Sequence, residues 1–470
     1  MTWYYRAEVK GIQSWIMSTS KLRDLKGGSM VIEKLPESAK VLLRELGIGA
    51  QPSQEAAGAI EYAFSSREDL ERFVAEWPLT VAQVAPGLQV THAWSEAPKD
   101  LAAQLRARRN LPTSAPFESG PWVARSGRSG LAALEPEASW PPTHGLHTDA
   151  PLLVKARALK DASSRFSKFG NLSEEGEGLL AFVHIDGTGI GNVFTKATPE
   201  QRPGLSKAMA DVAESSLEAA VARVKDDRSL PRLPLQVLVL GGDDLTFVCS
   251  AHIALDFTVA WLEAFEEQTA TIVSQVGLAR LRAGAGIAIA SRRYPFRRVS
   301  KLAEDLCKKA KKLVKNDKGE AIDSVLALQR VSTSEQDSSV DIGVWRLGSN
   351  PLADSHTPIP KVDHLKELTK LAGKLPRGGL RTWLTAFEAS PKPKAESNEG
   401  REPSQSATRM WKRLEEVQGD LFGKLKEVLA SMRADPLTGR GHHLTQKKND
   451  YWTPLRDALT LVTAARRKEL

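Results

Sequence analysis

The stretch Leu233–Ser250, LPLQVLVLGGDDLTFVCS, decides the expected fold of this chain. Its apolar run Val237–Leu240 meets two glycines and two aspartates, and a second apolar run, Leu245–Cys249, follows at once. Two short β-branched runs around a Gly-Asp turn are typical of a β-hairpin. Gly241 and Gly242 tolerate positive φ angles and let another group approach the backbone closely, so both are candidate substrate-binding residues.

Asp243 and Asp244 are expected at the tip of this hairpin or at the start of its return strand. Adjacent carboxylates on a rigid hairpin repel each other unless a cation lies between them. Mg²⁺ commonly uses one or two carboxylates together with substrate phosphates. An ordinary turn is the alternative, because Gly-Asp is common turn chemistry. The residues upstream favour the metal-site interpretation.

The upstream stretch Leu179–Gly191, LLAFVHIDGTGIG, predicts a buried strand that ends in Asp186 and leads into a glycine-rich turn. One amphipathic crossover helix over Glu200–Lys225 fits between this strand and the hairpin. Asp186 alone would be a strand-end cap, but with the Asp243–Asp244 pair it would complete a two-metal phosphoryl-transfer site. The turn offers backbone N–H groups near a helix start, which suit a triphosphate. The residues concerned are Gly187, Thr188, Gly189, Ile190 and Gly191.

The downstream residues predict a helix, a strand of small residues, a helix with a lysine-rich face and a last strand. These elements are Ile253–Val276, Arg282–Ala290, Val299–Lys315 and Ser324–Leu328. The resulting β-α-β-β-α-β-α-β order predicts a ferredoxin-like palm over residues 179–335. The lysines of the second helix would mostly be solvated, and one of them could reach a substrate phosphate as a point charge. They are Lys308, Lys309, Lys311 and Lys312.

Residues 1–95 predict a second, degenerate copy of the palm. Its hairpin position, near residues 56–58, has no aspartate pair, so we expect this copy to be non-catalytic and to brace the active palm. The predicted fold class is therefore α+β, with two ferredoxin-like palm domains, the second carrying GGDD, and a C-terminal helical domain.

The remaining residues predict less regular parts of the chain. An irregular basic connector is expected over residues 96–178, with one helix at 152–169 and a surface loop around His144 and His147. A helical domain is expected over residues 336–470, with helices at 361–375, 380–389, 407–433 and 451–468. A Pro/Ser/Lys/Glu-rich mobile linker is expected near 390–406, and His442–His443 in a loop.

Composition limits the classes of protein that fit. The chain has 470 residues, 41% of them hydrophobic, and a formal net charge of +8. No run approaches the ~20 apolar residues of a membrane span, and the N-terminus lacks a signal-peptide pattern. The two cysteines, Cys249 and Cys307, fall in predicted core elements, which suits a reducing, cytoplasmic compartment. The positive charge favours polyanionic partners, and nucleotides satisfy it as well as RNA does.

Four motifs, HIDGTGIG, LGGDDL, GAGIAIA followed by YPF, and LAEDLCKKAKK, together resemble the cyclase-type palm of the CRISPR polymerases. These are the large subunits of type III CRISPR effector complexes and their stand-alone relatives. The chain is more distantly similar to GGDEF diguanylate cyclases. The resemblance covers residues 179–330 well, and the opening YYRAEVKGIQSWIM also resembles the first palm of the same polymerases.

The resemblance implies both a site and an activity. Asp186, Asp243 and Asp244 would hold two Mg²⁺ or Mn²⁺ ions, and Lys311 would bind a triphosphate. The family joins nucleoside triphosphates, usually ATP, into cyclic oligonucleotide messengers used in antiviral defence. No His-Asp dipeptide occurs, so the nuclease domain that often precedes these palms, and DNA cleavage, are not expected.

Two other classes of function stay open at this point. The chain could be a structural, RNA-binding subunit of an effector complex whose synthesis is activated by target RNA. It could also be a nucleotide sensor without turnover. In the catalytic reading, the two nucleotides would meet between the two palms of one chain or across a homodimer.

Overall fold

The structure is a computed structural model, and it describes most of both palms and part of the remaining chain. The residues described are 2–19, 22–56, 58–109, 126, 151, 154–155, 158, 179–198, 201–228, 233–274, 280–315, 321–331, 343–350, 359–375, 405–431, 434–435, 440–445, 448–452 and 454–465.

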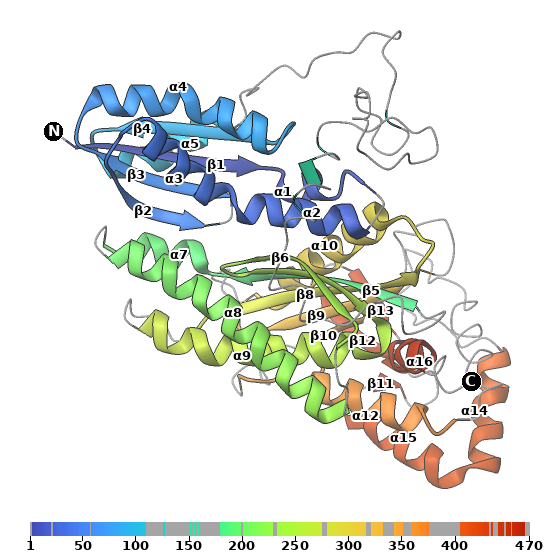
Figure 1. Ribbon diagram of the computed structural model, residues 1–470. Helices are drawn as coiled ribbons and strands as arrows, with labels where there is room; N and C mark the ends of the chain where they lie inside the picture. Colours follow the sequence, from blue (N-terminus) through green and yellow to red (C-terminus); the bar gives the residue numbers. More distant parts are fainter. Residues whose placement is uncertain are drawn as a thin grey trace.

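A six-stranded sheet forms the centre of the second palm, with the order β10-β9-β8-β5-β7-β6 (Figure 1). Its strands are β5 (Leu179–Thr188), β6 (Leu235–Gly241), β7 (Asp244–Ser250), β8 (Arg282–Ser291), β9 (Val325–Arg330) and β10 (Gly343–Arg346). The expected hairpin is present, because β6 and β7 pair as far as Gly241 and Asp244. β8 and β9 are parallel, whereas the other neighbours in this sheet are antiparallel.

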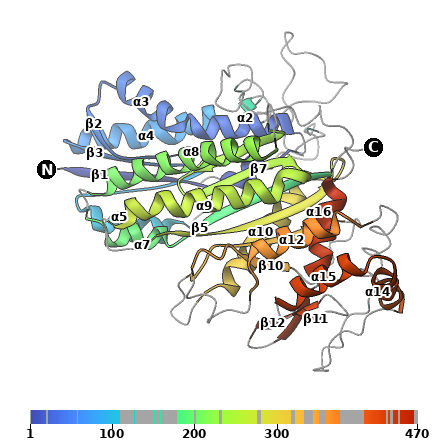
Figure 2. The ribbon, with the colours of Figure 1, turned by 90° about the horizontal axis from the view of Figure 1, so that it is seen from below.

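Helices cover both faces of this sheet. They are α7 (Ile190–Lys196), α8 (Gln201–Arg228), α9 (Ala254–Val273), which follows the short turn η2 (Ala251–Ile253), and α10 (Phe296–Leu313). α8 and α9 lie side by side under one face, and α10 crosses the other (Figure 1 and Figure 2). Because side chains alternate along a strand, Val183 and Ile185 belong to the core with α8 and α9, whereas Phe182 belongs to the core on the opposite face.

The first palm repeats the same topology in a four-stranded sheet. Its strands are β1 (Trp3–Lys10), β2 (Ala50–Ala56), β3 (Ala59–Phe64) and β4 (Gln89–Ser95), and its helices are α1 (Ile12–Ile16), α2 (Leu22–Glu33), α3 (Leu35–Glu45) and α4 (Arg67–Val84). The order β2-β3-β1-β4 corresponds to β6-β7-β5-β8 of the second palm. Phe73 and Trp77 of α4 stack and fill the space over this sheet, while Ser66 caps the helix by accepting the Asp69 N–H.

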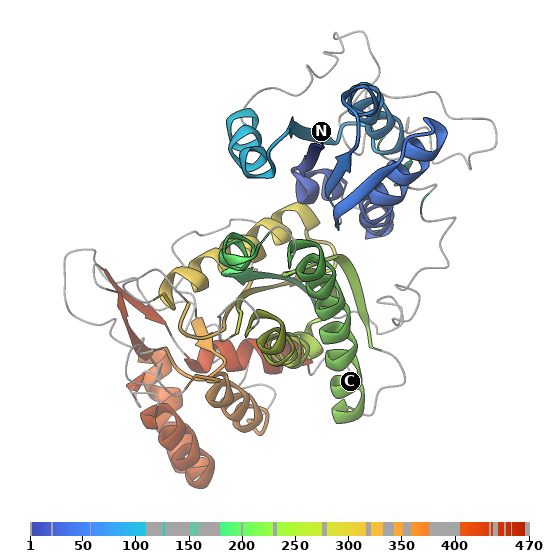
Figure 3. The same ribbon diagram turned by 90° about the vertical axis from the view of Figure 1, so that its left-hand side faces the viewer.

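The two palms share one hydrophobic core. Phe182 and Val248 of the second sheet belong to the same buried cluster as Leu25 of α2 and as Leu302 of α10. The first palm therefore lies against the face of the second sheet that α10 covers, and its strand β2 also contacts α8 (Figure 1 and Figure 3). Residues on that covered face of β5 and β7 point toward α10 and the first palm.

The C-terminal part contains helices, as expected, and a small sheet that the sequence did not predict. The helices are α12 (Val362–Ala372), α14 (Gln405–Val417), α15 (Gly419–Ser431) and α16 (Pro454–Ala465), and the strands are β11 (Ala434–Asp435), β12 (Arg440–Thr445) and β13 (Lys448–Trp452). The predicted loop at His442–His443 is wrong, because both residues lie in β12. The strand segments are short and largely polar, so they give no apolar period to detect.

Other local expectations also need correction. The single helix expected over 407–433 is two helices that meet at Gln418, and the helix expected from 451 begins at Pro454. The connector is not irregular at its start, because α5 (Pro98–Arg108) packs Leu101 and Leu105 against β4. Two leucines four residues apart are too short a pattern to stand out in the sequence.

Several expectations fall outside the described residues. These are the loop at His144 and His147, most of the helix at 152–169, the helix at 380–389 and the linker at 390–406 except its last two residues. The α+β fold class with two ferredoxin-like palms is confirmed. Within the described part of the chain, none of the helices combines the length and the apolar character needed to span a membrane.

Candidate functional site

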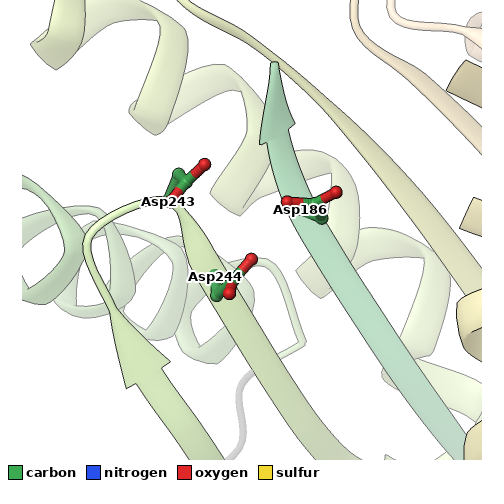
Figure 4. A group of neighbouring side chains, drawn as sticks. All are labelled: Asp186, Asp243 and Asp244. Carbon is green, nitrogen blue, oxygen red and sulfur yellow. The ribbon is translucent and has the colours of Figure 1, made fainter. Parts of the chain in front are cut away.

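Three carboxylates from two distant stretches meet at one rim of the second sheet. Asp186 lies near the end of β5, Asp243 lies in the β6–β7 turn and Asp244 begins β7. The pairing of Ile185 with Leu245 sets Asp186 beside Asp244 on the neighbouring strand. One oxygen from each of the three carboxylates lies within 4.8 Å of the others (Figure 4). The structure thus brings together the acidic residues singled out in the sequence.

Gly187 makes this close approach possible by lacking a side chain. A β-carbon at this position would overlap the Asp243 side chain and come 2.7 Å from its Oδ2 atom. The Gly187 N–H donates to the Asp243 carbonyl oxygen at 3.2 Å. The expectation that this N–H is free to bind phosphate is therefore wrong, because the strand extends two residues beyond Asp186, to Thr188.

The glycine-rich turn begins only at Gly189. This residue has φ 97° and precedes α7, and its carbonyl oxygen accepts the N–H groups of Asn192 and Val193. Gly191 is exposed, and a β-carbon there would meet nothing within 4 Å. On the hairpin, Gly242 has φ 59°, the left-handed conformation that the sequence led us to expect in this turn.

Burial and the charges of neighbouring carboxylates make Asp243 and Asp244 hold protons unusually strongly. Burial is the main cause that raises the pKa of Asp244 to about 8, and the charges of Asp243 and Asp186 raise it further. Burial and the Asp186 charge raise the pKa of Asp243 to about 6. A hard divalent cation would remove this repulsion, and oxygen-only donors at this spacing suit Mg²⁺ or Mn²⁺. The residues present therefore fit a metal site.

Lys311 of α10 already places one positive charge on these acids. Its Nζ atom donates to Asp186 Oδ2 at 2.5 Å and to the Gly187 carbonyl oxygen at 2.7 Å. The neighbouring lysines behave as the sequence indicates for a solvated face: Lys309 and Lys312 are exposed, and Lys308 pairs with Glu304 at 3.7 Å. Lys311 is the lysine of this helix that reaches the acids.

The first palm has a counterpart of this site without its acidic cluster. The Val9 N–H donates to the Gly58 carbonyl oxygen at 2.7 Å, as the Gly187 N–H does to the Asp243 carbonyl oxygen. Glu8 of β1 pairs with Ala59, the first residue of β3 in the β2–β3 hairpin. Glu8 therefore occupies the position of Asp186, whereas the hairpin carries Gly58 and Ala59 in place of the two aspartates.

Guanidinium groups hold this remaining carboxylate of the first palm. Arg6 donates to Glu8 at 2.8 Å and Arg109 at 2.9 Å. Among the described residues, the cluster of Asp186, Asp243 and Asp244 is the one group of acids and histidines close enough to hold a metal ion. The sequence reasoning overlooked Glu8, although its place three residues before Gly11, like Asp186 before Gly189, was a usable signal.

Comparison with known proteins gives a family match for the second palm. Residues 179–319 match the family model described as Cas10/Cmr2, second palm domain. The chain resembles the Cas10/Cmr2 family. The resemblance to large subunits of type III CRISPR complexes, expected from the motifs, is confirmed. No match is found among curated protein sequences.

Solved structures extend the similarity of this Cas10/Cmr2-like chain beyond one domain. A Csm1-Csm4 cassette in complex with pppApA is 15% identical, with a TM-score of 0.58, over 99% of this chain and 69% of that chain. A Csm1-Csm4 cassette in complex with cA4 is 14% identical, with a TM-score of 0.56, over 99% and 70%. Csm1 in T. onnurineus is 16% identical, with a TM-score of 0.53, over 99% and 70%. At these identities the matches show the fold.

One contact between the palms of this Cas10/Cmr2-like chain was not foreseen. His184 lies two residues before Asp186 on the same face of β5, and its Nδ1 atom is 3.0 Å from Thr246 Oγ1 and 3.4 Å from Gln13 Nε2. Burial is the main cause that lowers the pKa of His184 to about 4, so the ring is neutral at physiological pH. The period of two along β5 could have indicated His184, but nothing in the sequence links it to Gln13 of the first palm.

The raised carboxyl pKa values predict how stability depends on pH in metal-free protein. The unfolded chain releases these protons near the ordinary value of 3.8, whereas the folded cluster keeps them until about 6 for Asp243 and about 8 for Asp244. The folded state therefore binds more protons in this window, and the free energy of unfolding should fall as pH rises from about 4 to about 8. Thermal unfolding in EDTA at a series of pH values measures this slope.

Mg²⁺ should reverse the trend, because it binds the deprotonated carboxylates and stabilises the folded state more as pH rises. The double variant Asp243→Asn/Asp244→Asn isolates the contribution of the cluster from the rest of the chain. Its unfolding should show a shallower pH slope in EDTA and a smaller response to Mg²⁺. An unchanged slope in the variant would contradict the assignment of these protons to the cluster.

Proposed function

We propose that this protein is a nucleotidyltransferase that joins nucleoside triphosphates, ATP in the first place, into a cyclic oligonucleotide second messenger for antiviral defence. The single observation that carries the proposal is the convergence of Asp186, Asp243 and Asp244 at one rim, on the face of the sheet that meets the first palm. The family match of residues 179–319 supports it. So does the fold shared with Csm1-Csm4 cassettes solved with pppApA and with cA4.

Each residue of the site has a distinct role in this proposal. Asp186, Asp243 and Asp244 would hold two divalent cations, Mg²⁺ or Mn²⁺. Bound there, the cations would supply Lewis-acid stabilisation of the phosphates and lower the pKa of the attacking ribose 3′-hydroxyl. Asp186 and Asp244 lie on the paired strands β5 and β7, and Asp243 lies in the tight turn that joins β6 to β7, so the sheet holds the carboxylates in place. Gly187 keeps the space between Asp186 and Asp243 clear of any side chain.

The neighbouring residues would orient the substrates. Neutral His184 adds no positive charge beside Asp186, and its hydrogen bonds hold β5, β7 and α1 in a fixed relation. The turn from Gly189 to Gly191 and the hairpin glycines Gly241 and Gly242 would line the path of the triphosphate. The second nucleotide would lie on the side of the first palm, within one chain or across a homodimer.

The test of this function is a synthesis assay with radiolabelled ATP and Mg²⁺ or Mn²⁺, followed by chromatography and treatment with a 3′–5′ exonuclease. We expect an exonuclease-resistant product that contains no terminal phosphate, together with released pyrophosphate. Nucleotide binding without turnover, in every metal tested and with RNA present, would contradict the proposal and favour a sensor.

A second candidate is an RNA-dependent subunit of a CRISPR-type effector complex, and one surface favours it. The exposed side of α10 and of the turn before it is strongly basic, with acidic residues only at the half-buried Glu304 and Asp305. The basic residues are Arg292, Arg293, Arg297, Arg298, Lys301, Lys308, Lys309 and Lys312. Such a row suits a phosphate backbone. In the same synthesis assay, product that forms only when RNA is added would favour this candidate.

A further inference from the structure

Lys311 contacts Asp186, the same carboxylate that a divalent cation at the acidic cluster would bind. The Lys311 Nζ atom is 2.5 Å from Asp186 Oδ2 and 2.7 Å from the carbonyl oxygen of Gly187. The lysine side chain is 17% exposed and that of Asp186 is 39% exposed, so water screens this pair only in part. The ammonium group thus supplies one charge to a cluster of three carboxylates.

The position of the lysine is built into the fold. Gly284 of β8 pairs with Asp186 of β5, and a β-carbon on Gly284 would overlap the Lys311 side chain. One turn earlier on α10, the Cys307 thiol donates to the Gly284 carbonyl oxygen at 3.2 Å. The missing side chain at Gly284 therefore leaves the channel through which Lys311 reaches across β8 to Asp186.

We propose that Lys311 is an internal cation that competes with the first divalent metal for Asp186 and is released when metal and triphosphate bind together. This inference rests on the proposed function. Mg²⁺ in general binds oxygen ligands at about 2.1 Å, so an ammonium group on the same carboxylate would repel it strongly. The freed ammonium group needs a new anion, and the triphosphate tail supplies one.

Two measurable consequences follow from the competition. Without nucleotide, wild-type protein binds metal weakly, because the metal must displace the lysine. With nucleotide, metal affinity rises steeply, because the triphosphate accepts the lysine that the metal releases. The two ligands are then coupled through Lys311, and by linkage each tightens the binding of the other.

The experiment titrates Mn²⁺ into wild-type protein and variants and measures free Mn²⁺ by electron paramagnetic resonance, without and with the non-hydrolysable analogue AMPPNP. Lys311→Met should bind Mn²⁺ at least about tenfold more tightly than wild type in the absence of nucleotide, because a neighbouring positive charge is gone. The increase in Mn²⁺ affinity caused by AMPPNP should shrink in this variant. Lys312→Met, which removes an exposed lysine from the same helix, should match wild type.

A second variant keeps the positive charge of Lys311 but changes where the ammonium group lies. Gly284→Ala should push Lys311 away from Asp186 and raise Mn²⁺ affinity in the same direction as Lys311→Met. Thermal unfolding confirms that each variant is folded, and Lys311→Gln replaces Lys311→Met if the latter is not. Equal or weaker Mn²⁺ binding by the Lys311 variants overturns the proposal and makes the lysine a partner that orients Asp186. Absence of Mn²⁺ binding in wild type and all variants would instead refute the proposed metal site itself.

Discussion

Asp243→Asn/Asp244→Asn is expected to lower product formation from ATP by at least about a thousandfold while leaving the protein folded. Loss of one preorganised electrostatic group already costs catalysis about a hundredfold to a thousandfold, and this variant removes two carboxylates from one metal site. The amides keep the shape of the side chains but not their charge. Metal-free protein should be at least as stable as wild type above pH 8, because the repulsion with Asp186 is removed.

A matched control is present in the same chain. Asp226 and Asp227 form another adjacent aspartate pair, exposed on α8 and outside the acidic cluster. Asp226→Asn/Asp227→Asn should change the rate of product formation by less than about twofold, because surface substitutions of this kind have small effects. Comparable rates for wild type and Asp243→Asn/Asp244→Asn would eliminate the proposed mechanism, whereas comparable losses in both double variants would point to a general effect of lost charge.

The second large effect concerns stability, and it comes from Gly286 in the middle of β8. A β-carbon on this residue would overlap the Ala303 carbonyl oxygen and lie 2.7 Å from the Cys307 nitrogen. Both atoms belong to the backbone of α10, which cannot move aside as a flexible side chain can. We therefore expect Gly286→Ala to lower the free energy of unfolding by about 3 kcal/mol, at the upper end of the range for overpacked cores, or to prevent folding.

Urea unfolding measures this loss, and Gly423→Ala in α15 is its control. A β-carbon at Gly423 would meet nothing within 4 Å, so alanine there should be neutral or stabilise the helix by up to about 1 kcal/mol. Any folded Gly286→Ala protein should also bind Mn²⁺ differently, because the distance between α10 and β8 sets the reach of Lys311. Wild-type stability in Gly286→Ala would mean that α10 does not pack its backbone on this strand.

The close packing of α10 on β8 explains why two positions of this strand are glycine. Gly284 and Gly286 lie on the face covered by α10, and both would obstruct that helix if they carried a β-carbon. Isoleucines such as Ile287 and Ile289 lie on the other face, in the core with α9. The stretch RAGAGIAIA is therefore packed on both faces, and the glycines on the α10 face bring the backbone of that helix close enough for its lysine to cross to Asp186.

The sequence was sufficient for the parts of the site that follow from local pattern. An apolar run, a pair of glycines and a second apolar run can hardly form anything but a hairpin, so the tip position of Asp243 and Asp244 was predictable. The sequence also predicted a buried strand that ends in Asp186, followed by one crossover helix and the hairpin. This order of elements was enough to place the third acid at the same rim. Lys311 was singled out because it lies in LAEDLCKKAKK, one of the motifs that resemble the CRISPR polymerases.

Contacts between elements far apart in the chain had to wait for the tertiary structure. Glu8 with its two arginines, the contact of Gln13 with His184, and the place of Lys311 on Asp186 each join residues whose neighbours in sequence give no sign of the partner. The strand pairings of the small C-terminal sheet, β11 to β13, were likewise seen only in the tertiary structure. The period of apolar residues along a helix or strand shows which of its faces is buried, because the residues of that face recur at regular positions in the sequence. It does not report what covers that face, because the partner is chosen by packing of the whole chain.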